Sequence, residues 1–288
     1  MSVWRFDAIG THWEIETENS LSDAERFGVS AVIDDFDRTW SRFRTDSLVS
    51  TLADGGEAPS PADAPAMLDA YRELSDATRG AVNPLVGQSL SALGYDAVVS
   101  LVAGAPRPAP AEWDGILTWT GARLALAAPA QIDVGALGKG RLVDLVLAAL
   151  VDVQGSVTVD AGGDIAARGD EVRIGLEHPF DLTKAIGVAS IRDQALCASA
   201  VNRRAWGDGL HHVLDARTGA PVRTWAATWA IAPDAMRADA VATALFFDGG
   251  PEVAARWGVE WVRMSTAGMA ERSPKCPVEL FTSPGIRR

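Results

Sequence analysis

The sequence predicts an α+β fold in which largely antiparallel β-sheets are flanked by helices. Several strand-like runs in the second half of the chain are separated only by short turns, which favours antiparallel pairing beside helices. Other segments carry apolar residues at the spacing of a helix face. The 288 residues are 48% hydrophobic and 22% charged, so the chain has enough apolar side chains for a large core.

The N-terminal region predicts strand structure followed by a helix. Trp4–Thr17 alternates loosely between apolar and polar residues, with a turn or bulge at Ile9–Thr11. Ser22 and Glu25 have the spacing of a capping box, which opens a helix. The expected core-facing stripe of this helix consists of Phe27, Val29, Val32, Ile33, Phe36 and Trp40.

The helix should end at Ser41–Ser47 (SRFRTDS), where Phe43 and two arginines follow its last turn. By residue type alone, this segment is a solvated helix terminus. Gly and Pro content predicts a loop over Gly55–Pro65. A second helix is expected over about Met67–Thr78, with Gly80 ending it.

The middle of the chain contains the best internal boundary. Arg79–Leu90 should have a constrained, irregular backbone, because small residues accompany an Asn-Pro pair. Gly104–Pro110 (GAPRPAP) resembles a linker, and the runs ILTWT and RLALA around Gly121 predict a hairpin. We therefore expect a single domain over residues 1–288, with an internal subdomain boundary near residues 104–112.

The stretch Gln131–Asp144 (QIDVGALGKGRLVD) organises the rest of the chain. A β-type run leads to Asp133, four residues of little bulk surround Lys139, and Leu142–Leu150 predicts a buried helix. Small residues let a ligand approach backbone N–H groups, and a helix start carries partial positive charge, so the stretch suits a phosphate group. Plain packing produces the same pattern, whose spacing matches neither the dinucleotide fingerprint nor the P-loop. Both interpretations stay open on the motif alone.

The second half of the chain is rich in expected strands. Val157–Ile165 (VTVDAGGDI) predicts one whose central Gly162-Gly163 pair marks a bulge or the close approach of another group. The tail Arg272–Arg288 should be mostly irregular. Further strands are expected at EVRIGLE, AIGVASI, GLHHVLD and TWAIA.

A helix near residue 235 carries an oxygen pair. Asp234 is a good N-cap, and Asp239 and Thr243 stand four apart, on one helix face. Two hard oxygen ligands there could bind Mg²⁺. Spacing alone favours the alternative, in which Thr243 bonds its own preceding turn and Asp239 pairs with Arg237.

Bulk properties exclude several classes of protein. A formal charge of −12 argues against a nonspecific nucleic-acid binder. Cys197 and Cys276 lack metal or redox spacing, and Cys197 lies in an apolar run where a buried inert thiol is expected. No apolar segment reaches the ~18 residues of a spanning helix, and the start lacks a signal pattern. We expect a cytoplasmic protein without membrane insertion.

Among four histidines, only His211 and His212 lie beside other candidate groups, in the run HHVLDARTG. Adjacent strand side chains point to opposite faces, so at most one of the two should enter a given site. A structural role for either remains open. A hydrolytic triad of Ser199, His212 and Asp215 is disfavoured, because no nucleophile-elbow sequence surrounds Ser199.

Eight runs, taken in order, resemble the motif series of the ApbE-like FAD:protein FMN transferases: IGTHW, SRFRTDS, RGAVNPLVG, DVGALGKGRLVD, VDAGGDI, CASAVNRR, HHVLDARTG and ADAVAT. The resemblance extends from Ile9 to about Gly258. It implies two intimately packed subdomains with FAD at their junction. It also implies Mg²⁺-dependent transfer of the FMN moiety of FAD to a Thr or Ser of an acceptor flavoprotein, with release of AMP. An FAD pyrophosphatase and a non-catalytic FAD-binding or delivery protein are the alternatives.

The resemblance assigns roles by position. His212 falls on the family's histidine, a catalytic participant. The carbonyl of Ala136 and the side chains of Asp239 and Thr243 would hold Mg²⁺. The residues that would contact FAD are Ile9, Phe43, Ala81, Val82, Asn83, Asp133, Lys139 and Leu214.

Several positions depart from the family pattern. Asn83 stands where acidic acceptors are frequent, and Ala200 stands where glycine is usual. Ala242 occupies the place of a second acid near the metal, and Ala216 that of a proline. Without the second acid, Asp239 would be the only charged protein ligand of the metal.

Overall fold

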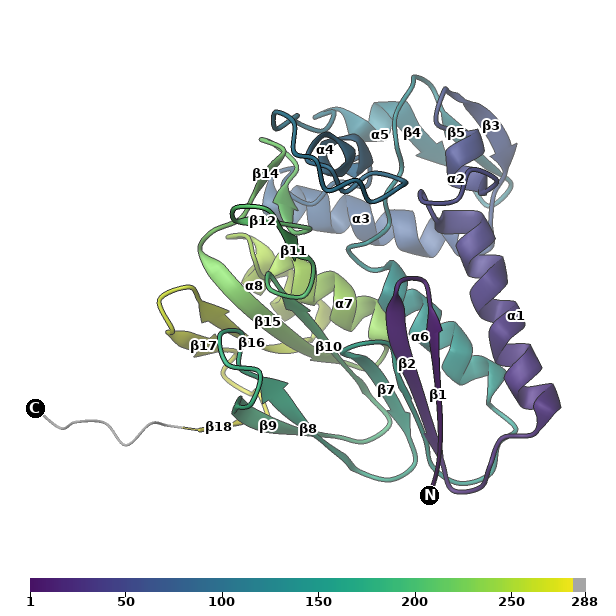
Figure 1. The fold of residues 1–288 in the computed structure, drawn as a ribbon, viewed down its shortest axis with the longest axis vertical. Helices are drawn as coiled ribbons and strands as arrows, with labels where there is room; N and C mark the ends of the chain where they lie inside the picture. Colours follow the sequence, from purple (N-terminus) through teal and green to yellow (C-terminus); the bar gives the residue numbers. More distant parts are fainter. Residues whose placement is uncertain (282–288) are drawn as a thin grey trace, which may run out of the picture.

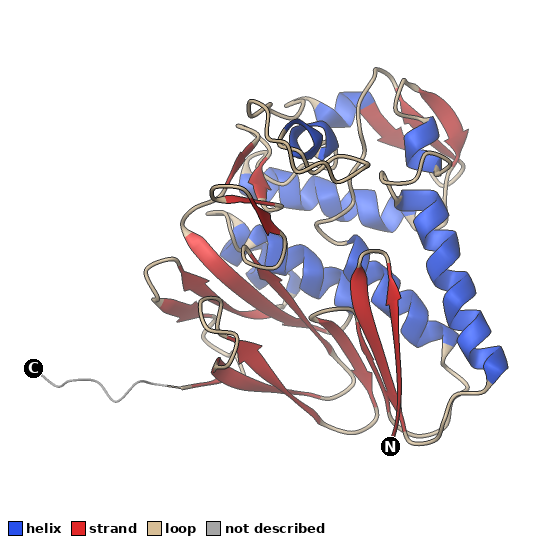
Figure 2. Ribbon diagram, viewed as in Figure 1, coloured by secondary structure: helices blue, strands red, loops and turns tan. Residues whose placement is uncertain are grey.

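The structure, a computed structural model, describes residues 1–281 and confirms the α+β class (Figure 1 and Figure 2). Helices gather on one side of the molecule, and the largest of its sheets has eight strands. The helices are α1 (Asp23–Trp40), α2 (Leu48–Thr51), α3 (Ala64–Thr78), α4 (Gly87–Ala92), α5 (Trp113–Ile116), α6 (Gly138–Ala149), α7 (Ala235–Ala244) and α8 (Gly250–Trp257).

The large sheet has eight strands, and every pairing in it is antiparallel. The N-terminal hairpin lies at one edge, beside strands that come more than a hundred residues later (Figure 1). In spatial order the strands are β1 (Ser2–Ala8), β2 (Thr11–Thr17), β6 (Val157–Asp160), β7 (Asp164–Arg168), β10 (Ala195–Ala200), β15 (Trp225–Ala232), β16 (Glu260–Ser265) and β17 (Ala270–Arg272).

Four smaller sheets complete the described part of the chain. Two of them have three strands each, and the other two are ribbons that pair two strands of two residues each. The three-stranded sheets are β18 (Glu279–Leu280), β9 (Ala185–Ile191) and β8 (Val172–Glu177), and β3 (Gly56–Pro59), β5 (Arg123–Leu126) and β4 (Leu117–Trp119). The ribbons are β11 (Ala205–Trp206) with β12 (Leu210–His211), and β13 (Leu214–Asp215) with β14 (Ala220–Pro221).

The core lies on both faces of the large sheet. On one face α6 and α7 pack against it, and α1 packs against α6 (Figure 1). On the other face the β8–β9 sheet covers a second apolar cluster, which includes Leu176, Leu196 and Trp229. Strand β15 is buried along almost its whole length because it has a layer on each side.

Helix α1 confirms the capping box, since Ser22 accepts from Glu25 N and Glu25 accepts from Ser22 N. Val29, Ile33, Phe36 and Trp40 are buried as expected. The prediction that Phe27 faces the core is wrong, because its side chain is 77% exposed. Phe27 stands two residues before Val29, which places the two side chains on nearly opposite sides of the helix.

Other predictions of strands and loops need correction. In some a turn was taken for part of a strand, and in others a strand was taken for a loop. The expected strand Val157–Ile165 is instead a hairpin of β6 and β7, with Gly162 and Gly163 in its turn. The loop Gly55–Pro65 contains β3, the run GLHHVLD is divided between β12 and β13, and β10 was not predicted. The hairpin around Gly121 is confirmed as β4 and β5.

The boundaries of three further segments bear on the site. Helix α6 begins at Gly138, so Lys139 lies in its first turn rather than in a preceding loop. The linker-like Gly104–Pro110 has no regular structure, while β3 before it and β5 after it pair in one sheet. Within residues 1–281, no helix combines the length and apolarity needed to cross a membrane. The expectation of irregular backbone over residues 282–288 lies outside the described residues.

Candidate active site

One cavity of about 650 Å³ gathers residues from almost every part of the chain. Its walls come from the tip of the β1–β2 hairpin, the turn after α1, the loop before α4, the start of α6, the segment before β13 and helix α7. A volume in this range suits a small-molecule or cofactor ligand. All twelve predicted site residues line it: Ile9, Phe43, Ala81, Val82, Asn83, Asp133, Ala136, Lys139, His212, Leu214, Asp239 and Thr243.

The cavity floor contains a buried charge cluster. The ammonium of Lys139 forms an ion pair with Asp164, a residue of β7 that is fully buried. Burial alone lowers the pKa of Lys139, but the charges of Asp164 and Asp239 outweigh it and raise that pKa above its ordinary value. Lys139 therefore stays cationic at neutral pH, and it provides the fixed positive charge that a phosphate group needs.

Helices α6 and α7 touch at a glycine. A Cβ on Gly140 would lie 2.1 Å from the carbonyl oxygen of Ala235 and 2.7 Å from Cβ of Asp239. This contact lets the N–H of Gly140 donate to Oδ2 of Asp239 at 2.9 Å. The N–H of Gly140 is thus bound to Asp239 rather than to the carbonyl of Ala136, four residues earlier, and Ala136 lines the cavity.

These groups fit a hard divalent cation such as Mg²⁺. Burial and the neighbouring Asp164 carboxylate raise the pKa of Asp239 to about 8, as expected where two acids are close together without enough positive charge. Oδ1 of Asp164 is buried and has no hydrogen-bond partner among the described residues. With Thr243 and the carbonyl of Ala136, the donor set is entirely oxygen, the set that Mg²⁺ prefers. Residues 1–281 contain no group of three or more His, Cys, Asp or Glu side chains that could hold a metal ion by themselves, so the fit depends on neutral oxygens as well.

His212 lines the cavity, whereas Nε2 of His211 lies 2.9 Å from the carbonyl oxygen of Val222. The expectation that only one of the pair enters the site therefore holds. Burial and the charges of Arg204 and Lys139 lower the pKa of His212 to about 3, so its imidazole is neutral at physiological pH. Nδ1 of His212 is buried and has no partner among the described residues. A neutral imidazole has a ring nitrogen that can accept a hydrogen bond from a bound hydroxyl group.

Asp133 is held in place by two other cavity residues. Nε of Arg42 donates to Oδ2 of Asp133 at 2.5 Å, and the N–H of Gly135 donates to Oδ1 at 2.8 Å. The hydroxyl of Tyr71 donates to the carbonyl of Asp133 and accepts from the N–H of Ala136. The backbone that leads to the predicted metal-binding carbonyl of Ala136 is thus fixed from helix α3.

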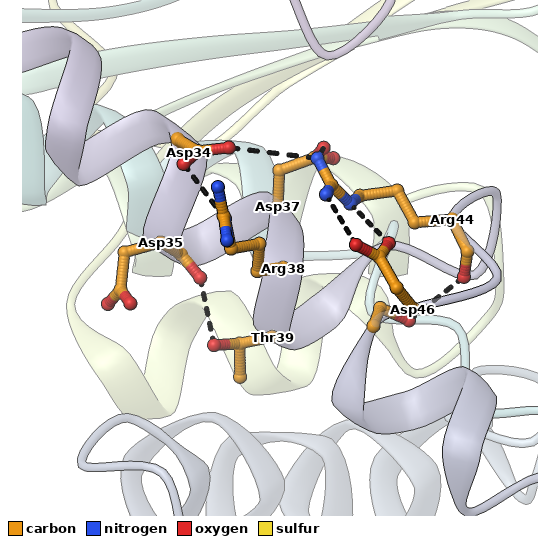
Figure 3. Close-up of polar contacts among 8 residues, drawn as sticks. Asp34, Asp35, Asp37, Arg38, Thr39, Arg44 and Asp46 are labelled. Atoms are coloured by element: carbon orange, nitrogen blue, oxygen red, sulfur yellow. Dashed lines mark hydrogen bonds and ion pairs between the residues drawn. The ribbon is translucent and has the colours of Figure 1, made fainter.

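An ion-pair cluster fixes the turn after α1, as Figure 3 shows. Arg44 donates to Asp46 through Nε and Nη2, both at 2.9 Å, and to Asp37 through Nη1 at 3.2 Å. Asp34 in turn accepts from Arg38. This network connects α1 to the residues before α2.

Two predicted contacts have unexpected surroundings. The side chain of Asn83 donates to the carbonyl of Pro110 and accepts from the N–H of Leu85, so its amide is already used within the protein. Ile9 has a φ of 47°, which is strained for a β-branched residue and is stabilised here by the hairpin turn. The disfavoured triad is absent in the described residues, because Asp215 pairs with Arg217.

The alternative pairing of Asp239 with Arg237 is wrong, since Arg237 pairs with Asp234, the confirmed N-cap of α7. Sequence reasoning also missed several residues of the site: Arg42, Tyr71, Tyr95 and Asp164. Only the run VDAGGDI, which contains Asp164, drew attention to one of them.

Comparison with known proteins agrees with this architecture. A family model described as the ApbE family matches residues 9–262. A FAD:protein FMN transferase of Rhodobacter capsulatus is 29% identical over 309 residues, which cover 96% of this chain and 57% of that protein. The chain thus spans little more than half the length of this relative.

Solved structures share the fold. The ApbE protein of Thermotoga maritima has a TM-score of 0.82 at 21% identity, covering 95% of this chain and 97% of that one. The apo form of the flavinyl transferase ApbE of Pseudomonas stutzeri has a TM-score of 0.77 at 20% identity, covering 95% and 94%. Because the family model matches most of its length, the chain belongs to the ApbE family.

Proposed function

We propose that this protein is a Mg²⁺-dependent FAD:protein FMN transferase, which moves the FMN moiety of FAD to a Thr or Ser of an acceptor flavoprotein. The observation that carries the proposal is the convergence of Lys139, His212, Asp239 and Thr243 on one cavity. Lys139 comes from α6, His212 from the segment before β13, and Asp239 and Thr243 from α7, and together they supply a cation, a base and hard oxygen ligands. The name of the Rhodobacter capsulatus relative supports the same activity.

The transfer replaces the phosphoanhydride bond of FAD with a phosphate ester on the acceptor. The acceptor hydroxyl attacks the phosphorus on the FMN side of the FAD pyrophosphate and forms a new P–O bond. The bond between that phosphorus and the bridging oxygen breaks, and AMP leaves with the bridging oxygen and its electron pair. In such reactions a protein acts mainly through positioning and charge neutralisation.

The residues of the cavity divide these tasks. Lys139 places its ammonium near the pyrophosphate, and its ion pair with Asp164 keeps that ammonium at the cavity floor. His212, which is neutral at physiological pH, takes the proton from the acceptor hydroxyl, and a nearby carboxylate is the alternative base. Ala136 O, Asp239 and Thr243 would hold Mg²⁺. When bound, Mg²⁺ neutralises charge on the phosphate oxygens and the leaving AMP.

A single assay distinguishes this function from its two alternatives. The protein is incubated with FAD and Mg²⁺, with and without an acceptor flavoprotein, and AMP, free FMN and protein-bound flavin are measured. Transfer gives AMP and bound flavin only when the acceptor is present. A pyrophosphatase gives AMP and free FMN without any acceptor, and a delivery protein gives no AMP at all.

Cytoplasmic residence also stays a prediction, which cell fractionation tests.

A further inference from the structure

Arg42 contributes a guanidinium group that the protein itself does not fully use. Its side chain is only 2% exposed and lines the cavity. Nε donates to Asp133, but Nη1 and Nη2 are both buried without a hydrogen-bond partner among the described residues. Unpaired donors on a buried charged group are costly, and native proteins keep few of them.

The turn does not need Arg42 for its own conformation. Arg44, two residues later, already binds Asp37 and Asp46 and connects the turn to α1 (Figure 3). The unpaired donors of Arg42 are therefore not a by-product of holding the backbone, and their partner should be a ligand of the cavity.

The surroundings of Arg42 select a planar ligand. Its guanidinium carbon lies 4.2 Å from the ring centroid of Phe43 and 5.2 Å from that of Tyr95. Both rings line the cavity, and Tyr95 stacks in turn on Trp206 at 5.5 Å. A flat ring system that enters beside these aromatic side chains would bring its edge to the two free N–H groups.

The two ring systems of FAD differ at their edges. In adenine the exocyclic amino group, a donor, lies next to N1 on one edge of the ring and next to N7 on another. Each of these edges therefore offers only one acceptor to a pair of donors. The pyrimidine part of the flavin offers adjacent acceptors, N1 with O2 and O4 with N5. A forked donor pair such as Nη1 and Nη2 matches two neighbouring acceptors.

We propose that Arg42 binds the pyrimidine edge of the flavin ring through Nη1 and Nη2, with Phe43 and Tyr95 as the aromatic wall beside it. The inference rests on the proposed function, because it assumes that FAD is the ligand. It adds a flavin-recognising residue to the site and gives Asp133 the task of orienting its guanidinium.

Binding measurements without Mg²⁺ or acceptor test the proposal. Calorimetry compares FAD, FMN and ADP on the wild type, Arg42→Met and Arg42→Lys. Arg42→Met should weaken FAD and FMN alike by about 10- to 100-fold, the effect of losing charged hydrogen bonds, and should change ADP binding by less than about twofold. Arg42→Lys keeps the charge beside Asp133 but not the fork, so its loss should be intermediate.

Arg263→Met is the matched control. Arg263 is also a largely buried arginine, with its guanidinium carbon 3.8 Å from the ring centroid of Trp225, but Glu271 and the carbonyl of Leu245 bind its nitrogens. It lies outside the cavity, so its loss should leave flavin binding unchanged. The spectrum of bound flavin gives a second readout: in Arg42→Met its visible absorption should move toward that of free flavin.

Three results would overturn the proposal. These are unchanged FAD binding by a folded Arg42→Met protein, a loss shared by FAD and ADP but not by FMN, and an equal loss for all three ligands. Failure of the wild type to bind FAD is a separate result, which would reject the proposed function itself.

Discussion

At the scale of single residues, Asp239 has two tasks that a substitution can separate. Its carboxylate accepts from the N–H of Gly140, and it is the proposed charged ligand of Mg²⁺. Asp239→Asn keeps an acceptor for Gly140 but removes the anion. We expect Mg²⁺-dependent AMP release to fall about 10²-fold or more. Thr243→Ala should have a milder effect, since water can replace a neutral oxygen ligand. Steady-state kinetics over a Mg²⁺ titration measure both, and full activity of folded Asp239→Asn at low Mg²⁺ would exclude the metal assignment.

Lys139 and Asp164 should be energetically coupled, because each neutralises the other at the cavity floor. Lys139→Met leaves a buried carboxylate without its cation and should lower the free energy of unfolding by about 3–5 kcal/mol. The double variant with Asp164→Asn removes both charges and should recover most of that loss. Urea denaturation without ligands gives the free energies of unfolding that the double-mutant cycle compares. Additive losses in the double variant would show that the pair is not coupled.

At the scale of elements, the contact between α6 and α7 depends on Gly140. Alanine is the better helix former, yet its Cβ would collide with the carbonyl of Ala235 and with Asp239. Gly140→Ala should therefore destabilise the protein by about 1–3 kcal/mol, and it should also weaken Mg²⁺ binding. Gly28→Ala in α1 is the matched control, since no atom lies within 4 Å of its added Cβ. It should stabilise by about 0.5–1 kcal/mol in thermal denaturation. Stabilisation by both substitutions would contradict the collision.

The start of α7 has a second cap from α6. Both carboxylate oxygens of Asp144 accept backbone N–H groups, those of Ala235 and Met236. Burial nevertheless raises the pKa of Asp144 from 3.8 to about 6. Between these values the folded state holds a proton that the unfolded state has lost. The contribution of Asp144 to stability is therefore full below pH 4 and decreases as the pH rises to about 6. Asp144→Asn should reduce the dependence of the free energy of unfolding on pH in this range. If the slope of that dependence is unchanged, groups other than Asp144 cause it.

At the scale of the whole molecule, the cavity walls extend from the N-terminal hairpin to α7. A ligand that contacts all of them should resist unfolding of the entire domain. FAD at a hundred times its Kd should raise the free energy of unfolding by about 2.7 kcal/mol and Tm by roughly 5 °C or more. Circular dichroism melts at increasing FAD concentrations test this. A Tm that does not depend on FAD concentration would argue against a site in this cavity.

The sequence predicted those features whose causes are local. The capping pair Ser22 and Glu25 and the N-cap Asp234 were found because partner and cap lie three residues apart. The positions of the site were found through motif resemblance, which carries family information that spacing lacks. Arg42 was not found, because its partner Asp133 is 91 residues away and only the fold brings the two together. Strand β10 was missed because a strand buried on both faces shows no alternation of apolar and polar residues.

The pairing of β2 with β6 has a consequence for synthesis on the ribosome. Ile15 lies opposite Val159, so the partner of the N-terminal hairpin leaves the ribosome more than 140 residues later. At a translation rate of about 5–20 residues per second, the hairpin waits roughly 7–30 s with Trp13 and Ile15 uncovered. Both side chains are almost completely buried in the finished protein. The hairpin is thus synthesised long before the strand that completes its sheet, and a chaperone that shields apolar nascent chain should increase the yield of folded protein.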